Sequence, residues 1–287
     1  MTTASDLALD VRRVEANGIH LNVATAGDGP TIVLLHGWPH TWEVWRPVLP
    51  ALAATQHVVA PDLRGLGRSD KPEDGYDVHT LADDVAGLLD ALGVQRAAVV
   101  GIDLGAPVAF MTALRHPARV ERLVVMESLL GRLPGAEGFL SNGPPWWFGF
   151  HAVPGFPETI LAGRASAYID WFLRAGTYER AGLPQHLRDA FVAAYEDPAT
   201  LHCGFQHYRA LPMNAALIAD AVADRRIEVP VLALGGNVVG DALHRQLAPI
   251  SDDLRGAVLP RCGHIVPVDA PEALLAQLGS FLQAPAQ

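Results

Sequence analysis

The chain has 287 residues, half of them hydrophobic, and its 31 acidic and 21 basic side chains give a formal net charge of −10. This length suits one large domain or a core domain with an insertion, and the hydrophobic content excludes a largely disordered protein. The negative charge argues against nucleic acid and anionic membranes as partners.

The start of the chain and its cysteines bear on where the protein works. Residues 1–6 contain no basic stretch followed by an apolar run, so no signal peptide is expected. No window is apolar and long enough to span a bilayer. Cys203 and Cys262 lie far apart and outside any Cys-x-x-Cys pair, as expected for reduced thiols. We therefore expect a protein of the cytoplasm.

Short apolar runs alternate with helix-like stretches, a pattern typical of a mostly parallel sheet covered by helices. A helix is expected at residues 81–92, where apolar residues recur at helical spacing before Gly93, a signal for a helix C-terminus. The apolar runs predict strands buried on both faces, at residues 31–35, 57–60, 97–100, 122–126 and 229–234.

One stretch interrupts this alternation. Residues 129–213 contain no clear buried strand, but they do contain turn signals and aromatic-rich helical segments such as residues 168–172. We expect an inserted helical cap there, over a core domain formed by residues 1–128 and 214–287. Ordinary peripheral helices are the alternative.

A tight turn from a strand into a helix is predicted around Asp103. Residues 99–106 read Val-Val-Gly-Ile-Asp-Leu-Gly-Ala, and a helical pattern continues through residues 110–114. Such a turn has room only for small flanking residues and exposes its central side chain beside the N–H groups of the helix. A carboxylate needs no base to activate it and can displace a leaving group at an sp³ carbon. The pattern therefore predicts Asp103 as a nucleophile.

Two other loops supply the partners that such a nucleophile needs. Residues 34–39, Leu-Leu-His-Gly-Trp-Pro, end a strand in a loop whose N–H groups, including that of Trp38, would form half of an oxyanion hole. The N–H of Leu104, next to Asp103, would form the other half. The bond between Trp38 and Pro39 is a candidate cis peptide. His264 lies on a loop that begins at Gly263 and is the last of the twelve histidines in the chain. In this kind of site the catalytic histidine follows the nucleophile along the chain, which favours His264.

These motifs together resemble the α/β-hydrolases of the epoxide hydrolase and dehalogenase branch. The resemblance runs from Val11 to the final helix and rests on His-Gly-Trp-Pro at residues 36–39, on residues 62–70, on the turn at Asp103 and on Gly263-His264. The His-Gly-x-Pro form is similar to that of epoxide hydrolases in particular. The resemblance implies an α/β-hydrolase fold, a mostly parallel sheet with a helical cap.

The resemblance also implies an acid that orients His264, and two positions compete for this role. The usual position, after residues 233–236, falls near Val239 by count, so Asp241 is out of register. Some bacterial epoxide hydrolases carry the acid one strand earlier, where this chain has Glu127. Burying a glutamate at the end of an apolar strand is unfavourable without a partner such as a histidine N–H. We favour Glu127.

In the family that the chain resembles, the cap supplies hydrogen-bond donors, commonly two, that hold the epoxide oxygen as the ring opens. Residues 205–211 match the segment that bears the ring-opening tyrosine, which implies Tyr208 as the acid. Trp147 occupies the position of a second donor by count, and its indole N–H can donate a hydrogen bond but not a proton. The alternative is that Trp146 and Trp147 only line an apolar pocket. The remaining candidates are His151 and His207 as weaker donors, and Trp146, Phe150 and His36 as substrate contacts.

The resulting interpretation is an epoxide hydrolase that forms an ester on Asp103 and hydrolyses it with His264. The resemblance implies that the enzyme needs no metal or organic cofactor. It implies a small-molecule epoxide as the only partner, and it leaves open whether a second copy of the chain forms a homodimer with the first. The aromatic cap residues favour a bulky, neutral, aromatic substrate. Tandem tryptophans with a tyrosine are also similar to epoxide hydrolases of bacterial aromatic polyketide pathways, which would place the enzyme in secondary metabolism.

Two alternatives remain. A haloalkane dehalogenase has Trp after its nucleophile, where this chain has Leu104, and a haloacetate dehalogenase has an Arg that is not found near Asp103. A binding protein without activity on this fold would leave the nucleophile, the histidine and the oxyanion loop unexplained.

Overall fold

The computed structural model describes residues 8–283. Its sheet has eight strands in the order β1-β2-β4-β3-β5-β6-β7-β8, and all neighbours from β4 to β8 are parallel. The strands are β1 (Asp10–Ala16), β2 (Ile19–Ala26), β3 (Thr31–Leu35), β4 (His57–Pro61), β5 (Ala97–Ile102), β6 (Val120–Met126), β7 (Val231–Gly235) and β8 (Leu254–Val258). All five predicted strands are confirmed.

The boundaries differ from the predictions in ways that the backbone explains. β7 begins at Val231 rather than at residue 229, because Pro230 has no N–H to donate to a neighbouring strand. β1 and β2, which we did not predict, pair antiparallel across a turn in which Asn17 and Gly18 both have positive φ, of 48° and 77°. Two such residues suit a two-residue hairpin.

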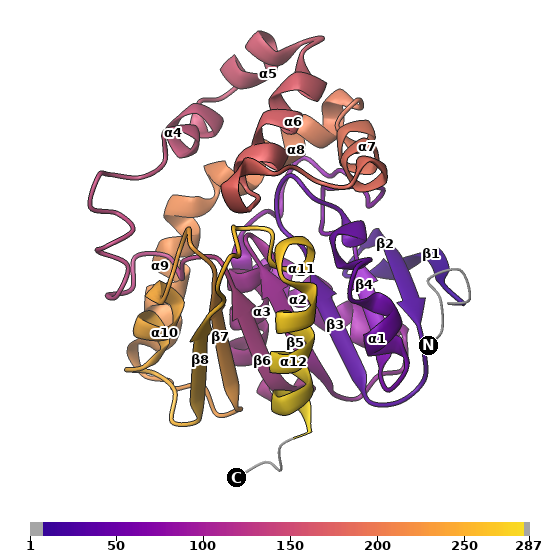
Figure 1. The fold of residues 1–287 in the computed structure, drawn as a ribbon, viewed down its shortest axis with the longest axis vertical. Coiled ribbons are helices and arrows are strands. Elements are labelled where there is room, and N and C mark those ends of the chain that lie inside the picture. Colours follow the sequence, from indigo (N-terminus) through magenta and orange to yellow (C-terminus); the bar gives the residue numbers. More distant parts are fainter. Residues whose placement is uncertain (1–7, 284–287) are drawn as a thin grey trace.

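Helices cover both faces of the sheet. The predicted helix is α2 (Val78–Ala91), which begins earlier than expected because the Asp77 side chain accepts hydrogen bonds from the N–H groups of His79 and Thr80. α2 and α3 (Gly105–Arg115) lie on the far side of the sheet in Figure 1, and α12 (Pro271–Leu282) lies on the near side. α11 (Val266–Asp269) packs against α12, and α1 (Leu49–Ala53) packs against β4. α9 (Leu211–Ala223) contacts α2, and α10 (Ala242–Leu247) packs against β7 and β8.

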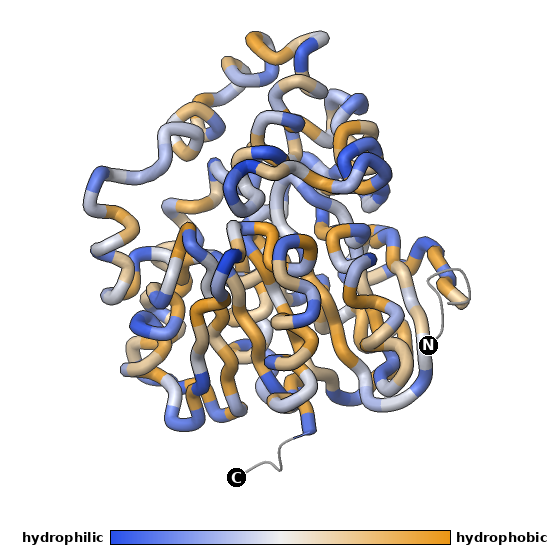
Figure 2. Tube along the Cα trace, viewed as in Figure 1, coloured by the Kyte–Doolittle hydropathy of each residue, from blue (hydrophilic) through white to orange (hydrophobic). Residues whose placement is uncertain are grey.

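The core lies between these layers. Every residue of β5 and β7 is buried, and Figure 2 shows the central strands as mostly hydrophobic. An apolar strand with both faces covered is stabilised by removing both sets of side chains from water. This core holds the carboxyl ends of β3, β5 and β6 at one edge of the sheet.

Five helices lie over that edge (Figure 1) and follow β6 in the chain. They are α4 (Trp146–Ala152), α5 (Phe156–Leu161), α6 (Ala165–Ala175), α7 (Gln185–Ala194) and α8 (Pro198–Arg209), and we refer to them as the covering helices. Within the described chain, no strand interrupts them between β6 and β7. The expected end of the cap at residue 213 falls inside α9, which therefore belongs in part to each predicted region. Among residues 8–283, no helix has the length and hydrophobicity needed to cross a membrane.

Candidate active site

The turn at Asp103 is the sharp strand-to-helix connection expected from the sequence. Asp103 lies between β5 and α3 and has a φ of 53°, in the left-handed region that non-glycine residues rarely adopt. A Cβ atom on Gly101 would collide with the carbonyl oxygen of Gly105, and one on Gly105 with that of Leu35. The two glycines are therefore required by the close approach of backbone on both sides of the strained residue.

Backbone N–H groups hold the Asp103 carboxylate in place. The Trp38 N–H donates to Asp103 Oδ1 over 2.7 Å, and the N–H of Leu104 also donates to this carboxylate. A Cβ on Gly37 would run into the carboxylate, so this loop position also needs glycine. Burial alone would raise the pKa of Asp103, but the hydrogen bond and charge of His264 and these N–H groups lower it below its usual value. The carboxylate is thus kept in its nucleophilic form.

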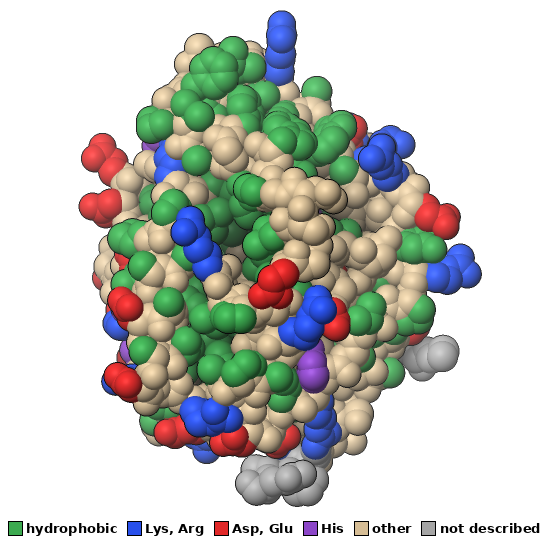
Figure 3. Space-filling view, turned by 90° about the vertical axis from the view of Figure 1, so that its left-hand side faces the viewer, with side chains coloured by type: hydrophobic (Ala, Val, Ile, Leu, Met, Phe, Trp, Pro, Cys, Tyr) green, Lys and Arg blue, Asp and Glu red, His purple; other side chains and the backbone are tan. Residues whose placement is uncertain are grey.

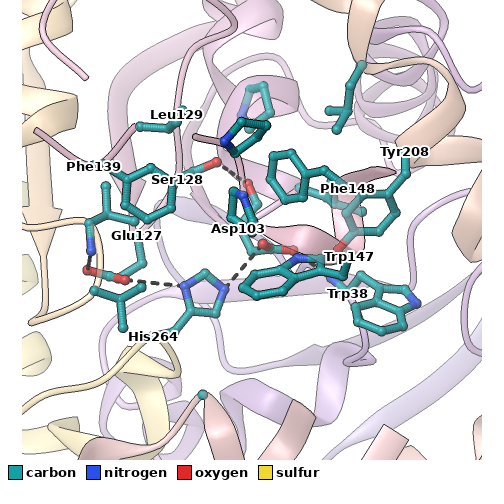
Figure 4. Close-up of a pocket in the computed structure, with 18 of the residues that line it drawn as sticks. Trp38, Asp103, Glu127, Ser128, Leu129, Phe139, Trp147, Phe148, Tyr208 and His264 are labelled. Atoms are coloured by element: carbon teal, nitrogen blue, oxygen red, sulfur yellow. Dashed lines mark hydrogen bonds and ion pairs between the residues drawn. The ribbon is translucent and has the colours of Figure 1, made fainter. Parts of the chain in front are cut away.

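His264 lies between two carboxylates (Figure 4). Its Nε2 is 3.2 Å from Asp103 Oδ2, and its Nδ1 is 3.2 Å from Glu127 Oε2. His264 follows β8 and Glu127 follows β6, so the sheet sets their separation. Burial alone would lower the pKa of His264, but hydrogen bonds and negative charge from Asp103 and Glu127 raise it well above its usual value.

Glu127, and not Asp241, is the acid that the structure brings to His264. The Glu127 side chain is fully buried, and its Oε1 accepts hydrogen bonds from the N–H groups of Gly236 and Val239, the latter over 3.2 Å. Asp241 lies beyond that loop with a side chain 57% exposed, 3.0 Å from Arg245. The loop after β7 thus contributes N–H groups to the site instead of a carboxylate.

A cavity of about 1100 Å³ opens over Asp103 and His264. Figure 3 shows it as a hollow with hydrophobic side chains in its walls. The walls come from the segment after β6, from α4, α6, α8 and the start of α9, and their large apolar residues are Leu129, Leu133, Phe139, Leu140, Trp147, Phe148, Trp171, Phe172 and Leu211. Such a cavity suits a bulky apolar molecule.

Tyr208 and Trp147 both border this cavity. The Tyr208 ring lies edge-on to Trp38, with 5.7 Å between centroids, and in the described part of the chain its hydroxyl has no hydrogen-bond partner. Burial, assisted by the charge of Asp103, raises the pKa of Tyr208 well above its usual value. Trp147 packs edge-on against Phe172 at 5.5 Å. Tyr208 lies across Asp103 from His264 (Figure 4).

The three expected substrate contacts do not reach the cavity. His36 is fully buried and bonded within its own loop, with Nδ1 2.8 Å from the Gly37 oxygen and Nε2 accepting from the Leu63 N–H. Trp146 is 55% exposed, because it lies on the outer face of α4, and Phe150 packs among Trp146 and other aromatic rings. The weaker donor candidates are also elsewhere: His151 Nε2 is bonded to the Tyr168 hydroxyl and His207 Nε2 to the Arg64 oxygen.

Several polar residues that the sequence analysis overlooked border the cavity, namely Ser128, His40, Arg132, Glu137 and Arg180. The Ser128 hydroxyl donates to the Asp103 carbonyl oxygen over 2.8 Å and so supports the strained turn. Its position directly after Glu127 was the available signal. His40 follows directly after the His-Gly-Trp-Pro motif. The Trp38–Pro39 bond is cis, as the candidate assignment expected. Residues 8–283 contain no group of three or more His, Cys, Asp or Glu arranged to hold a metal ion.

Comparison with known proteins shows similarity to α/β-hydrolases. Residues 30–174 match a family model described as the alpha/beta hydrolase fold. The chain is 32% identical to a soluble epoxide hydrolase of Corynebacterium sp., over 90% of this chain and 92% of the relative. It is 26% identical to a fluoroacetate dehalogenase of Burkholderia sp., over 94% and 93%. A solved structure of the epoxide hydrolase CorEH superposes with a TM-score of 0.87 and 30% identity, covering 96% and 98% of the two chains.

Proposed function

Since the chain belongs to the α/β-hydrolase family, in the branch of epoxide hydrolases and dehalogenases, we propose that this hydrolase opens a bulky, neutral epoxide to a vicinal diol. One observation carries the proposal: the carboxylate of Asp103 and the unpartnered hydroxyl of Tyr208 border the same apolar cavity. A nucleophile and a proton donor on opposite sides of a substrate are what opening of an epoxide ring needs.

In the first step, Asp103 attacks an epoxide carbon. Oδ1 is held by the Trp38 N–H, so Oδ2 is the oxygen available to form the new C–O bond. The carbon–oxygen bond of the epoxide breaks, its electron pair remains on the oxygen, and Tyr208 supplies a proton there. Trp147 adds a hydrogen bond from its indole N–H. The product of this step is a hydroxyalkyl ester of Asp103.

In the second step, His264 takes a proton from water, which attacks Cγ of the ester. The negative charge that develops on Oδ1 is stabilised by the N–H groups of Trp38 and Leu104. The tetrahedral intermediate then collapses to the carboxylic acid of Asp103, and the alcohol leaves with the proton that His264 took from water. The carboxylic acid of Asp103 gives its proton, directly or through solvent, to the Tyr208 phenolate left by the first step, which regenerates both the carboxylate and the phenol. Glu127 keeps the imidazole in position throughout.

The charge of Asp103 links the two steps. While Asp103 is a carboxylate, His264 has two acidic partners, and its raised pKa favours the imidazolium. Forming the ester removes one of these negative charges, so the pKa of His264 falls, the imidazolium gives its proton to solvent, and the neutral ring can act as a base. His264 takes a proton from solvent again once the Asp103 carboxylate is regenerated.

An Asp103→Asn variant tests this link, because the amide is uncharged like the ester. We expect the pKa of His264 to fall in this variant, as measured by NMR titration of the imidazole nitrogens. Asp241→Asn is the control and should leave the pKa of His264 in place, since Asp241 is paired with Arg245 outside the site. An unchanged pKa in Asp103→Asn would contradict the proposed coupling.

We further propose that residues 129–213 act as a cap that selects the substrate, over a core formed by residues 1–128 and 214–287. The rings of Phe139, Phe148 and Phe172 on the cavity wall support an aromatic substrate.

Both cysteines are buried and free, which accords with the reducing cytoplasm as the place of action.

The experiment that tests the function separates epoxide opening from cleavage of a carbon–halogen bond. Single-turnover formation of the Asp103 ester is measured with styrene oxide and, in parallel, halide release with fluoroacetate. Tyr208→Phe keeps the ring and removes the proton donor, so alkylation by the epoxide should slow by about 10²–10⁴-fold. Trp147→Phe should lose less, because a neutral hydrogen bond contributes about 0.5–1.5 kcal/mol.

Two outcomes would contradict the assignment. If Tyr208→Phe alkylates as fast as the wild type, Tyr208 is not the acid. If the wild type releases fluoride and leaves epoxides intact, the protein is a dehalogenase with the same nucleophile.

A further inference from the structure

Residues 129–140, which we call the wall segment, form one side of the active-site cavity. The segment contains no helix or strand, and eight of its twelve residues border the cavity. In Figure 4, Leu129 and Phe139 of this segment lie on the same side of Asp103 as Glu127 and away from Tyr208. Because no helix or strand fixes the wall segment, its position depends on contacts with other parts of the core.

One buried side chain of the core holds the start of the wall segment. Gln246 of α10 is 1% exposed, and its Oε1 accepts a hydrogen bond from the Leu130 N–H over 2.9 Å. Its Nε2 donates to the Leu133 oxygen over 2.8 Å and to the Leu130 oxygen over 3.5 Å. A glutamine amide is both donor and acceptor, and here both functions are used on backbone groups at either end of the cavity-lining pair Gly131-Arg132.

The wall segment also lies directly on the backbone of α10. Gly135 has a φ of 120°, and a Cβ atom on it would come within 2.8 Å of both the Arg245 carbonyl carbon and the Gln246 nitrogen. Only glycine permits this close approach. The next residue, Ala136, packs in a small apolar cluster with Val239 and Ala242. Side-chain hydrogen bonds and backbone contact therefore fix the wall segment to the same helix.

The contacts that support the wall differ from those that support the catalytic acid. The Val239 N–H donates to Glu127 Oε1 over 3.2 Å, whereas in the part of the chain that the structure describes the Gln246 amide hydrogen-bonds to the wall segment alone. Removing the amide should therefore disturb the wall and leave the contact between Glu127 and His264 in place.

We propose that Gln246 is a positioning residue that determines selectivity for substrate size. By holding the wall segment against α10, it fixes the shape of the cavity on the Glu127 side, and so favours epoxides whose second bulky substituent packs against that wall. This inference rests on the proposed epoxide hydrolysis and deepens it, since it names the part of the substrate that the wall segment recognises.

The physical reason lies in the backbone groups that Gln246 satisfies. Without the amide, the Leu130 N–H and the Leu133 oxygen lose their partner, and buried unpaired backbone groups are unfavourable, so the wall segment should shift to positions in which water reaches them. A bulky substituent then loses a preformed surface and must order the wall when it binds. A small epoxide that reaches only Asp103 and Tyr208 does not use this surface.

The test compares a large and a small epoxide, trans-stilbene oxide and propylene oxide, in the wild type and in Gln246→Met. Methionine keeps the length of the side chain and removes both hydrogen bonds. For trans-stilbene oxide, kcat/KM should fall by about 10-fold, the scale of two lost neutral hydrogen bonds, and the change should lie in KM. For propylene oxide, kcat, KM and the single-turnover rate of ester hydrolysis should stay within about twofold of the wild type.

Gly135→Ala displaces the same wall without removing the amide, and it keeps the inference testable if Gln246→Met folds poorly. It should reproduce the selective loss for trans-stilbene oxide. Gly143→Ala is its matched control, because Gly143 also has a positive φ, of 81°, but a Cβ atom there meets nothing within 4 Å and the residue does not border the cavity. This control should keep the selectivity of the wild type.

The outcomes that contradict the inference differ from those that contradict the function. Equal losses for the two epoxides in Gln246→Met and Gly135→Ala would mean that the contacts only stabilise the fold, and would overturn the inference. Unchanged selectivity in both variants would overturn it as well. If the wild type turns over neither epoxide, the proposed function fails, and the inference fails with it.

Discussion

The His264→Gln variant should form the ester on Asp103 and fail to hydrolyse it. Glutamine can keep a hydrogen bond to Glu127, but it cannot take a proton from water, so general base catalysis, typically about 10²–10⁴-fold, is lost from the second step. Alkylation needs only the carboxylate, the N–H groups that hold it and Tyr208, all of which remain. Incubation with an epoxide should therefore end after one half-turnover.

The measurement is intact-protein mass spectrometry followed by peptide mapping, which should show one added substrate mass on the Asp103 peptide. His202→Gln is the control, because His202 is exposed on α8, lies 2.8 Å from Glu158 and does not border the cavity. It should turn over normally without adduct. An unmodified His264→Gln protein, under conditions in which the wild type consumes the epoxide, would contradict the covalent mechanism.

Glu127→Gln should also arrest hydrolysis, by about 10³–10⁴-fold, the loss typical when the carboxylate behind a catalytic histidine is removed. The structure supplies the reason. The N–H groups of Gly236 and Val239 require an acceptor at Oε1, so the glutamine carbonyl faces them and the NH₂ group faces Nδ1 of His264. Nδ1 must then be the acceptor, which places the proton on Nε2, the atom that should act as base.

Asp241→Asn is the matched control, since it makes the same carboxylate-to-amide change on the loop after β7 but away from His264. Its hydrolysis rate should stay close to that of the wild type in a single-turnover assay. If Asp241→Asn stops hydrolysis and Glu127→Gln does not, the assignment of the acid must be reversed.

The sequence by itself determined the parts of the site that depend on chain neighbours. The turn at Asp103 requires a strand, small residues on both sides and a helix, all within about ten residues, so the local pattern was sufficient to predict it. The apolar strands were predictable for the same reason, because burial on both faces leaves a run of hydrophobic residues. His264 was predictable from chain order on this fold.

Only the tertiary structure decided which of several similar residues face the cavity. Successive residues on a helix point about 100° apart, so of the adjacent tryptophans on α4 one lines the cavity and the other is mostly exposed, and composition does not reveal the helix rotation. His36 resembled a substrate contact in sequence, yet its ring nitrogens are used within its own loop.

The acid depended on long-range contacts in the same way. Glu127 becomes a partner of His264 because N–H groups more than a hundred residues later in the chain turn toward its other oxygen. Local patterns reveal which backbone is strained or buried, but the partners of a buried polar group are set by where the sheet and the covering helices bring distant residues together.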